Sequence, residues 1–267
     1  MVLELVLVCL ILGSVVGVMA GLLGIGGGAI MVPILAMTFR SQGLFSDDLM
    51  HVALGTSIAA IIVTSFSSMR EHKNNGYVNW SIVKPISIGV LIGAFLFGFL
   101  ASMFSAKALA IFFSIFMFYV ATKIIFNLNS NTVSALPSNK ILTLAGFGIG
   151  GVSTLVSIGG GSLTVPFLLS RKIDAKTAIG SSAAIGLPIS LAGTLGYILS
   201  GMGKLPASEF TLGYVYWPAV LAISITSYMT APLGAKLVHR LPVSTLKKGF
   251  AILLVAISAK MILSIAS

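Results

Sequence analysis

The amino-acid sequence predicts an all-α polytopic membrane protein built from two inverted-topology repeats of about five helical segments each. First, 57% of the 267 residues are hydrophobic and only 8% are charged, whereas about 25% of a typical soluble domain is charged. Second, continuous apolar runs of membrane-spanning length recur from one end of the chain to the other. Third, a glycine-rich motif and the segments around it occur twice in the same order.

The glycine-rich motif interrupts apolar sequence once in each half of the chain. Residues 24–33 read GIGGGAIMVP, and residues 157–166 read SIGGGSLTVP. Glycine lets another backbone or a ligand approach closely, and paired interruptions at matching places of two halves are typical of transport sites. The residues assigned to these breaks are Gly26, Gly27 and Gly28 with the helix-breaking Pro33, and Gly159, Gly160 and Gly161 with the helix-breaking Pro166.

The first repeat is predicted over residues 1–127. It opens with an apolar segment at about 3–23, then the glycine break, and then only about eleven apolar residues, 29–39. Eleven helical residues cannot cross about 30 Å of hydrocarbon. The opening pair is therefore either one span plus a half-helix or a re-entrant hairpin, and the sequence leaves both open. Three further segments are expected at about 49–69, 81–103 and 108–126.

The second repeat is predicted over residues 141–267, after a polar linker at 128–140. A segment at about 141–156 precedes the second break, and about nine residues follow the break up to Ser170. The next segment carries the sequence AIGSS, which matches ALGTS in the first repeat, and the segment after it opens on YVYW, which matches YVNW. A last helix is expected to carry Lys260. Together the repeats should form one integrated transport domain.

The distribution of charge predicts how the chain lies in the membrane. Five segments per repeat is an odd number, so the second copy should be inverted. With both termini on one side, the connections on that side hold Arg40, Lys107, Lys204 and Lys260, and the other side holds the remaining twelve of 16 Lys and Arg. Basic residues collect in cytoplasmic loops, so both termini are predicted outside. This bias accounts for the formal net charge of +10 without a nucleic-acid partner.

The short helices after the breaks suggest where a ligand binds. They are expected to begin at Ala29 and Ser162, where free backbone N–H groups and the positive end of the helix dipole favour an anion. No convincing Asp, Glu or Arg lies at mid-membrane depth in the apolar segments. The predicted substrate-binding residues are the six break glycines together with the hydroxyl residues Thr56, Ser57, Ser181 and Ser182.

Simpler explanations compete with this site. The glycines could serve only tight helix packing, and the hydroxyls could bond only their own helix backbone. The sequence from Gly146 to Gly151 matches a dinucleotide fingerprint, but no strand precedes it, so helix packing is expected there. No metal site is predicted from the scattered histidines His51, His72 and His239, and no cofactor is expected. Several lysines near helix ends, Lys107 among them, should extend to the membrane interface.

The chain resembles the TauE/SafE family, also called the 4-toluene sulfonate uptake permease family. The features that carry the resemblance are both glycine breaks with their prolines, Gly55-Thr56-Ser57, Gly180-Ser181-Ser182, and His72 with Gly76-Tyr77-Val78-Asn79-Trp80. The resemblance covers essentially the whole chain. It implies a secondary transporter in the bacterial inner membrane that moves sulfite, sulfonates or other small organosulfur and carboxylate anions. The second half departs from the first in having Ser181 at the position of Thr56 and no match to His72.

We therefore expect a carrier, not an enzyme, that moves a small, sulfur-containing anion by alternating access within the lipid bilayer. An anion channel is the main alternative, followed by a membrane-embedded enzyme or an assembly factor. A coupling ion, either H⁺ or Na⁺, and a homodimeric assembly are compatible with the sequence but are not specified by it.

Overall fold

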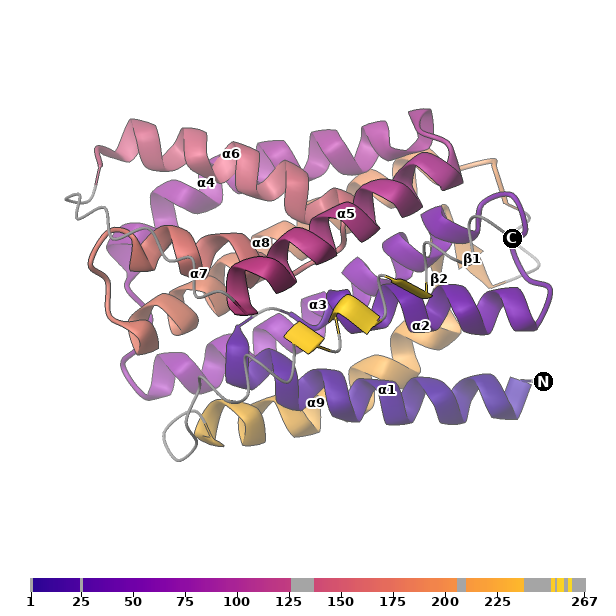
Figure 1. The fold of residues 1–267 in the computed structure, drawn as a ribbon, viewed down its shortest axis with the longest axis horizontal. Helices are drawn as coiled ribbons and strands as arrows, with labels where there is room; N and C mark the ends of the chain where they lie inside the picture. The colour runs from indigo at the N-terminus through magenta and orange to yellow at the C-terminus, as the bar shows by residue number, and fades with distance from the viewer. Residues whose placement is uncertain are drawn as a thin grey trace.

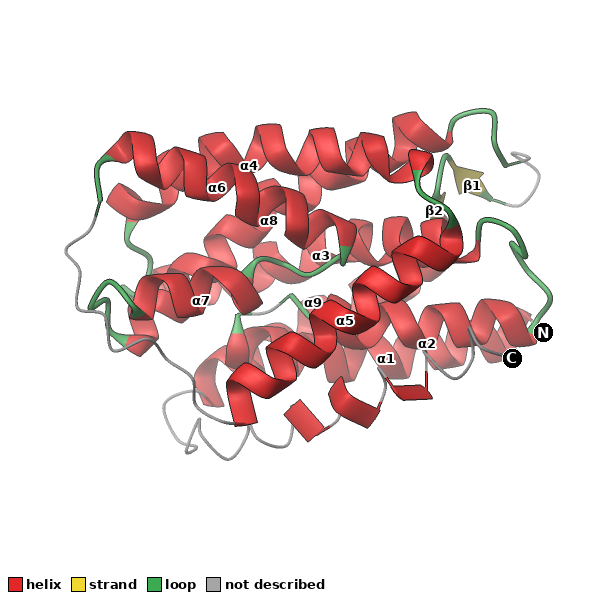
Figure 2. Ribbon diagram, turned by 45° about the horizontal axis from the view of Figure 1, so that its top comes forward, coloured by secondary structure: helices red, strands yellow, loops and turns green. Residues whose placement is uncertain are grey.

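The computed structural model describes residues 2–24, 26–125, 137–205 and 210–237, and short pieces at 251–252, 254–256 and 259–260. The long helices run roughly along the longest axis of the molecule (Figure 1). The second view shows the same bundle with almost no sheet (Figure 2). The predicted linker at 128–140 and the predicted last helix lie largely outside the described residues.

The helices follow the predicted order. In the first half they are α1 (Val2–Leu23), α2 (Gly28–Ser41), α3 (Leu49–Asn74), α4 (Trp80–Leu100), the 3-10 turn η1 (Ala101–Met103) and α5 (Ala106–Ile125). In the second half they are α6 (Asn139–Leu155), α7 (Gly161–Leu169), α8 (Ala175–Gly201) and α9 (Trp217–Leu237). Helix α6 begins within the predicted linker, two residues before the expected start of the second repeat. A small hairpin before α9 was not predicted; in it β1 (Thr211–Leu212) pairs antiparallel with β2 (Val215–Tyr216).

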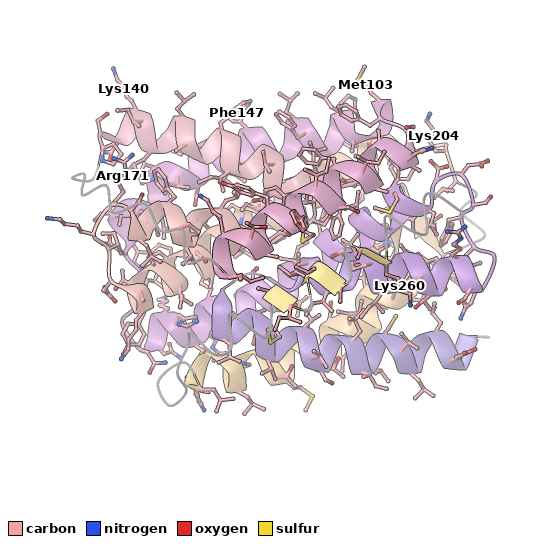
Figure 3. All side chains as sticks on the ribbon, viewed as in Figure 1. Met103, Lys140, Phe147, Arg171, Lys204 and Lys260 are labelled. Atoms are coloured by element: carbon pink, nitrogen blue, oxygen red, sulfur yellow. The ribbon has the colours of Figure 1, made fainter. Side chains whose placement is uncertain are left out.

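Six helices in the described part of the chain are long and apolar enough to cross a membrane: α1, α3, α4, α5, α8 and α9. Large apolar side chains lie exposed on their outer faces, including Ile92 on α4, Ile115 on α5 and Ile225 on α9. In water such faces would be costly, whereas lipid accommodates them. Figure 3 shows Lys140 and Arg171 at one end of the bundle and Lys204 at the other. The prediction of a helical, polytopic membrane architecture is confirmed.

Small residues let pairs of helices approach closely. Helix α1 packs on α9, and α6 packs on α4. A Cβ added at Gly17 would collide with the backbone and side chains of α9, and one at Gly146 would meet the backbone of Ile86 on α4. The glycines at four-residue spacing in α1, Gly13, Gly17 and Gly21, thus allow close packing on α9. The apparent dinucleotide fingerprint lies within helix α6, where packing was expected.

Asp174 caps the start of α8 and yields a prediction about pH. Its side chain accepts hydrogen bonds from the backbone N–H groups of Lys176 (3.1 Å) and Thr177 (3.0 Å). Hydrogen bonding from Thr177, first from its side chain and then from its backbone N–H, favours the carboxylate and holds the pKa of Asp174 below its ordinary value of 3.8, and the Lys176 N–H adds to this effect. The stabilisation is therefore complete above about pH 4 and is lost as pH falls through the lowered pKa.

We expect Asp174→Asn to leave the protein almost as stable at pH 7, because Asn caps helices as well as Asp. The variant should lose less stability than the wild type between about pH 4 and pH 2. Thermal unfolding of purified protein in detergent at several pH values measures this difference. Identical pH profiles for the two proteins would contradict the capping role.

Candidate functional site

Both glycine breaks end in the same backbone conformation. Gly27 has φ 79° and ψ −3°, and Gly160 has φ 79° and ψ −24°, a left-handed region that glycine adopts without strain. The helices α2 and α7 begin at the next residue, one position earlier than predicted, and neither start has a side-chain cap. At 14 and 9 residues they are about 21 and 14 Å long, shorter than the hydrocarbon layer.

The two breaks meet inside the protein. An ideal Cβ at Gly26 would lie 2.7 Å from the Cα of Gly159, and a Cβ at Gly28 would overlap the carbonyl oxygen of Ser157. All four residues are buried. From this contact α2 and α7 run toward opposite ends of the molecule (Figure 1). We call this contact the glycine junction and define it by Gly24, Gly26, Gly27 and Gly28 together with residues 157–161.

Helices α3 and α8 hold the glycine junction from both sides. The Ser182 hydroxyl on α8 donates a hydrogen bond to the carbonyl of Gly24 (3.1 Å). The Ser157 hydroxyl donates to the carbonyl of Leu54 on α3 (2.7 Å). A Cβ at Gly186 on α8 would lie 2.8 Å from the carbonyl oxygen of Gly159. Each break is thus fixed to a long helix of the other half of the chain.

The four predicted hydroxyl residues fall into two groups. Thr56 and Ser181 accept hydrogen bonds from the backbone N–H groups of Tyr216 (3.0 Å) and Asn79 (3.0 Å), which precede α9 and α4. Ser182 contacts the glycine junction. Ser57 is fully buried, and its hydroxyl has no hydrogen-bond partner among the described residues. A hydroxyl buried without a partner is uncommon and invites a ligand explanation.

The contacts of Thr56 and its neighbours with the second half match those of Ser181 and its neighbours with the first half. A Cβ at Gly55 would meet the carbonyl of Tyr214, and a Cβ at Gly180 would meet the carbonyl of Tyr77. One turn earlier on α3, His51 stacks on the ring of Tyr214 with 4.8 Å between centroids. At the matching place on α8, the Lys176 ammonium lies 5.7 Å from the centroid of Tyr77.

Further hydroxyl residues near the second break were not among the binding residues predicted from the sequence. Ser153, Ser162 and Thr164 carry buried hydroxyl oxygens without a partner in the described part of the chain. The Thr164 oxygen lies 3.5 Å from the position of a Cβ on Gly160. A signal was present, because the second break has Ser162 and Thr164 where the first has Ala29 and Met31.

The site is polar without being charged. Among the described residues, the buried polar side chains are hydroxyls and two histidines. His72 bonds the carbonyl of Gly21 (3.1 Å), and no group of three metal-ligating side chains occurs in the described ranges. Helix starts and hydroxyls can donate hydrogen bonds to an anion.

Comparisons with known proteins give matches over nearly the whole chain. A family model described as sulfite exporter TauE/SafE matches residues 9–261. A probable membrane transporter protein of Haemophilus influenzae is 38% identical over 261 residues, covering 97% of this chain and 98% of the relative. Similar proteins occur in Methanocaldococcus jannaschii (28% identical; 85% of this chain and 84% of the relative) and, as the probable membrane transporter protein YunE, in Bacillus subtilis (25%; 96% of each). No solved structure gives a significant match.

Proposed function

Because the chain belongs to the sulfite exporter TauE/SafE family of membrane transporters, we propose that it is a secondary carrier of a small anion. The cargo is sulfite, a sulfonate or a related organosulfur anion, carried across the bacterial inner membrane. Transport proceeds by alternating access, with a substrate site at the glycine junction.

The meeting of two helix starts at the glycine junction carries this proposal. The first N–H groups of a helix have no partner within the helix, and its dipole makes that end positive. Helices α2 and α7 begin next to each other without side-chain caps and run apart. Gly26, Gly27, Gly28, Gly159 and Gly161 would bring backbone N–H groups to the anion, and Ser57 and Thr164 would add hydroxyl donors. The Gly160 N–H and the Ser182 hydroxyl already donate to the carbonyls of Ile158 and Gly24, so these two residues would shape the site instead.

The reciprocal contacts support two inverted repeats that form a single transport domain. Thr56 bonds the connection before α9, and Ser181 bonds the matching connection before α4. In this proposal Thr56 and Ser181 shape the site by holding these connections, and tilting of one repeat against the other exposes the junction to each side in turn. The basic end that holds Lys140 and Arg171 faces the cytoplasm, so both termini lie outside.

Uptake by purified protein in proteoliposomes tests the proposed function. The panel comprises sulfite, thiosulfate, an alkanesulfonate and sulfate, each measured with an H⁺ gradient, with a Na⁺ gradient and with neither. We expect saturable uptake of at least one sulfur oxoanion, and acceleration of that uptake when the same anion is loaded on the other side. Uptake that rises linearly with concentration and lacks such exchange would indicate a channel, and the absence of uptake of all four anions would refute the proposal.

A further inference from the structure

A cavity of about 230 Å³ lies beside α2, away from the glycine junction. Its walls come from α2, from the first turn of α3 and from the first turn of α5. The deeper residues Pro33, Met50 and Ala110 are buried, whereas Arg40, Ser46 and Lys107 are exposed at its mouth. The cavity therefore has an apolar floor and a polar, solvent-facing opening.

Two cationic side chains line the mouth of this cavity. Arg40 lies in the last turn of α2, and Lys107 lies in the first turn of α5. A helix start already carries positive potential, so a lysine is electrostatically unfavourable there. The start of α5 and both cations add positive potential to one opening. The Asp48 carboxylate, at the start of α3, lies 3.5 Å from His51.

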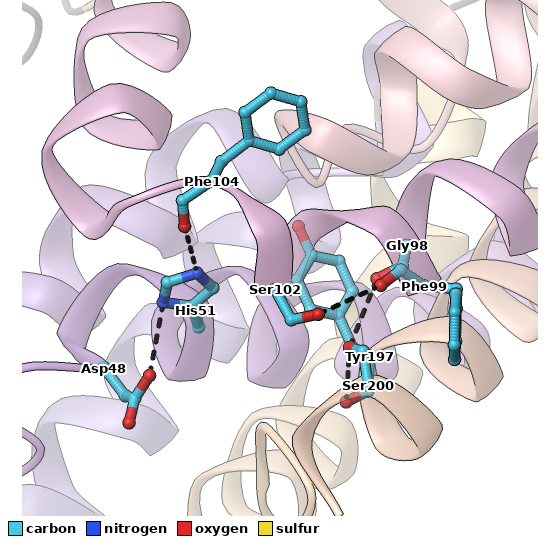
Figure 4. A network of polar contacts seen from close by, with 8 residues as sticks. All are labelled: Asp48, His51, Gly98, Phe99, Ser102, Phe104, Tyr197 and Ser200. Carbon is cyan, nitrogen blue, oxygen red and sulfur yellow. Dashed lines mark hydrogen bonds and ion pairs between the residues drawn. The ribbon is translucent and has the colours of Figure 1, made fainter. Parts of the chain in front are cut away.

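His51 fixes the two walls relative to each other. Figure 4 shows its ring between Asp48, at the start of α3, and the backbone of Phe104, just before α5. The Phe104 carbonyl lies 3.0 Å from Nε2 of His51, and because a carbonyl can only accept, Nε2 carries the proton. This bond ties the first turn of α3 to the connection before α5, and the cavity is thus a built feature of the fold.

The cavity and the glycine junction lie along the same helix, α2. Arg40 at the mouth is twelve residues from Gly28, and Pro33 at the floor is five residues from it. On a helix these separations correspond to about 18 and 8 Å along the axis. An anion held between Arg40 and Lys107 would therefore need to move a little over three helical turns, about 18 Å, to reach the junction.

We propose that this cavity is a vestibule that captures the anion from solution before it enters the glycine junction. The inference rests on the proposed function, and it assigns to Arg40 and Lys107 the task of holding the acidic group. For Lys107 this goes beyond the membrane-interface role expected from the sequence. The buried floor holds the apolar body of the ligand, so an organic anion binds better here than an inorganic one.

The size of the cavity selects a small occupant. Its 230 Å³ equals the share of roughly eight water molecules in the liquid. A short-chain organic acid of about eight non-hydrogen atoms fills that space, whereas a whole phospholipid does not. Of a phospholipid, only the anionic headgroup could compete for Arg40 and Lys107. The binding experiment below distinguishes a lipid headgroup from a soluble anion by changing the lipid of the nanodisc.

Calorimetric binding of butanesulfonate and of inorganic sulfate to the full chain in neutral phosphatidylcholine nanodiscs tests the vestibule. Arg40→Gln and Lys107→Gln should each weaken butanesulfonate binding about fivefold, and the double variant more than tenfold. Lys123→Gln is the matched control, because Lys123 lies at the other end of α5, over Tyr119, and should leave binding unchanged. Ala110→Leu, which fills the floor, should block binding without removing a charge.

Several results would overturn the vestibule. These are the absence of butanesulfonate binding by the wild type, equal binding of sulfate and butanesulfonate, or unchanged binding in the double variant. Loss of butanesulfonate binding when phosphatidylglycerol replaces phosphatidylcholine would identify a lipid headgroup as the occupant and would equally overturn it. Uptake with an unchanged KM in the double variant would refute the vestibule but leave the carrier standing. Butanesulfonate binding at this cavity without uptake by the wild type would refute the carrier, and with it the role of the cavity in transport.

Discussion

Gly28→Ala is expected to abolish anion uptake, although it adds a single methyl group. The new Cβ would coincide with the carbonyl oxygen of Ser157, a backbone atom of the opposite break, so the two breaks could meet only by moving apart. Overpacking of this kind costs about 1–3 kcal/mol in stability, and it would displace both helix starts from a shared substrate. Uptake in proteoliposomes and thermal unfolding in detergent measure the two effects.

Gly148→Ala is the matched control for Gly28→Ala. Gly148 lies in α6, and an added Cβ would meet nothing within 4 Å. Alanine favours the helix by about 0.5–1 kcal/mol over glycine, so this variant should be at least as stable as the wild type and equally active. Normal uptake by Gly28→Ala would show that the close approach of the two breaks is dispensable.

Thr56→Val combined with Ser181→Ala is expected to uncouple the two halves of the transporter. Each change removes the hydroxyl acceptor of one backbone N–H, from Tyr216 or from Asn79. A partly buried N–H left without an acceptor costs about 1–3 kcal/mol. Because the two sites lie on different helices, the stability losses should add. The rate of uptake should fall at least tenfold, since both connections guide the proposed movement of the repeats.

The control for this pair is Thr122→Val. The Thr122 hydroxyl bonds the carbonyl of Phe118 on its own helix (2.8 Å), so the same chemical change there disturbs no contact between the halves. Melting curves and initial uptake rates of the single, double and control variants should be compared. A double variant that keeps wild-type stability and rate would contradict the locking role of Thr56 and Ser181.

Much of the helical architecture could be predicted because hydrophobicity and glycine dominate the local signal. The apolar runs located the described helices, and the repeated GIGGG and SIGGG motifs located both breaks. The sequence left open whether each repeat begins with one span plus a half-helix or with a re-entrant hairpin. The answer depends on how far α1 and α6 extend before the junction, and the length of an apolar run alone does not decide this.

The roles of individual hydroxyls could not be predicted in the same way. Thr56 and Ser57 are neighbours on α3, but the first bonds Tyr216 and the second is buried without a described partner. Which helix face meets the other half of the chain depends on tertiary packing and not on local sequence. The hairpin before α9 was missed because its two paired positions, Thr211 and Leu212 with their partners, are too few for an alternating pattern.

The most direct test of an anion site at the glycine junction is the KM for uptake in Ser57→Ala and Thr164→Val. Both side chains are fully buried, and their hydroxyls have no partner in the described part of the chain, so their removal breaks no hydrogen bond within it. Ser114→Ala is the control, because the Ser114 hydroxyl bonds its own helix at Ala110 (2.8 Å). We expect each site variant to keep its thermal stability and to raise KM by about tenfold, the loss of one hydrogen bond to a charged ligand, while Ser114→Ala matches the wild type. An unchanged KM in both site variants would place the anion elsewhere.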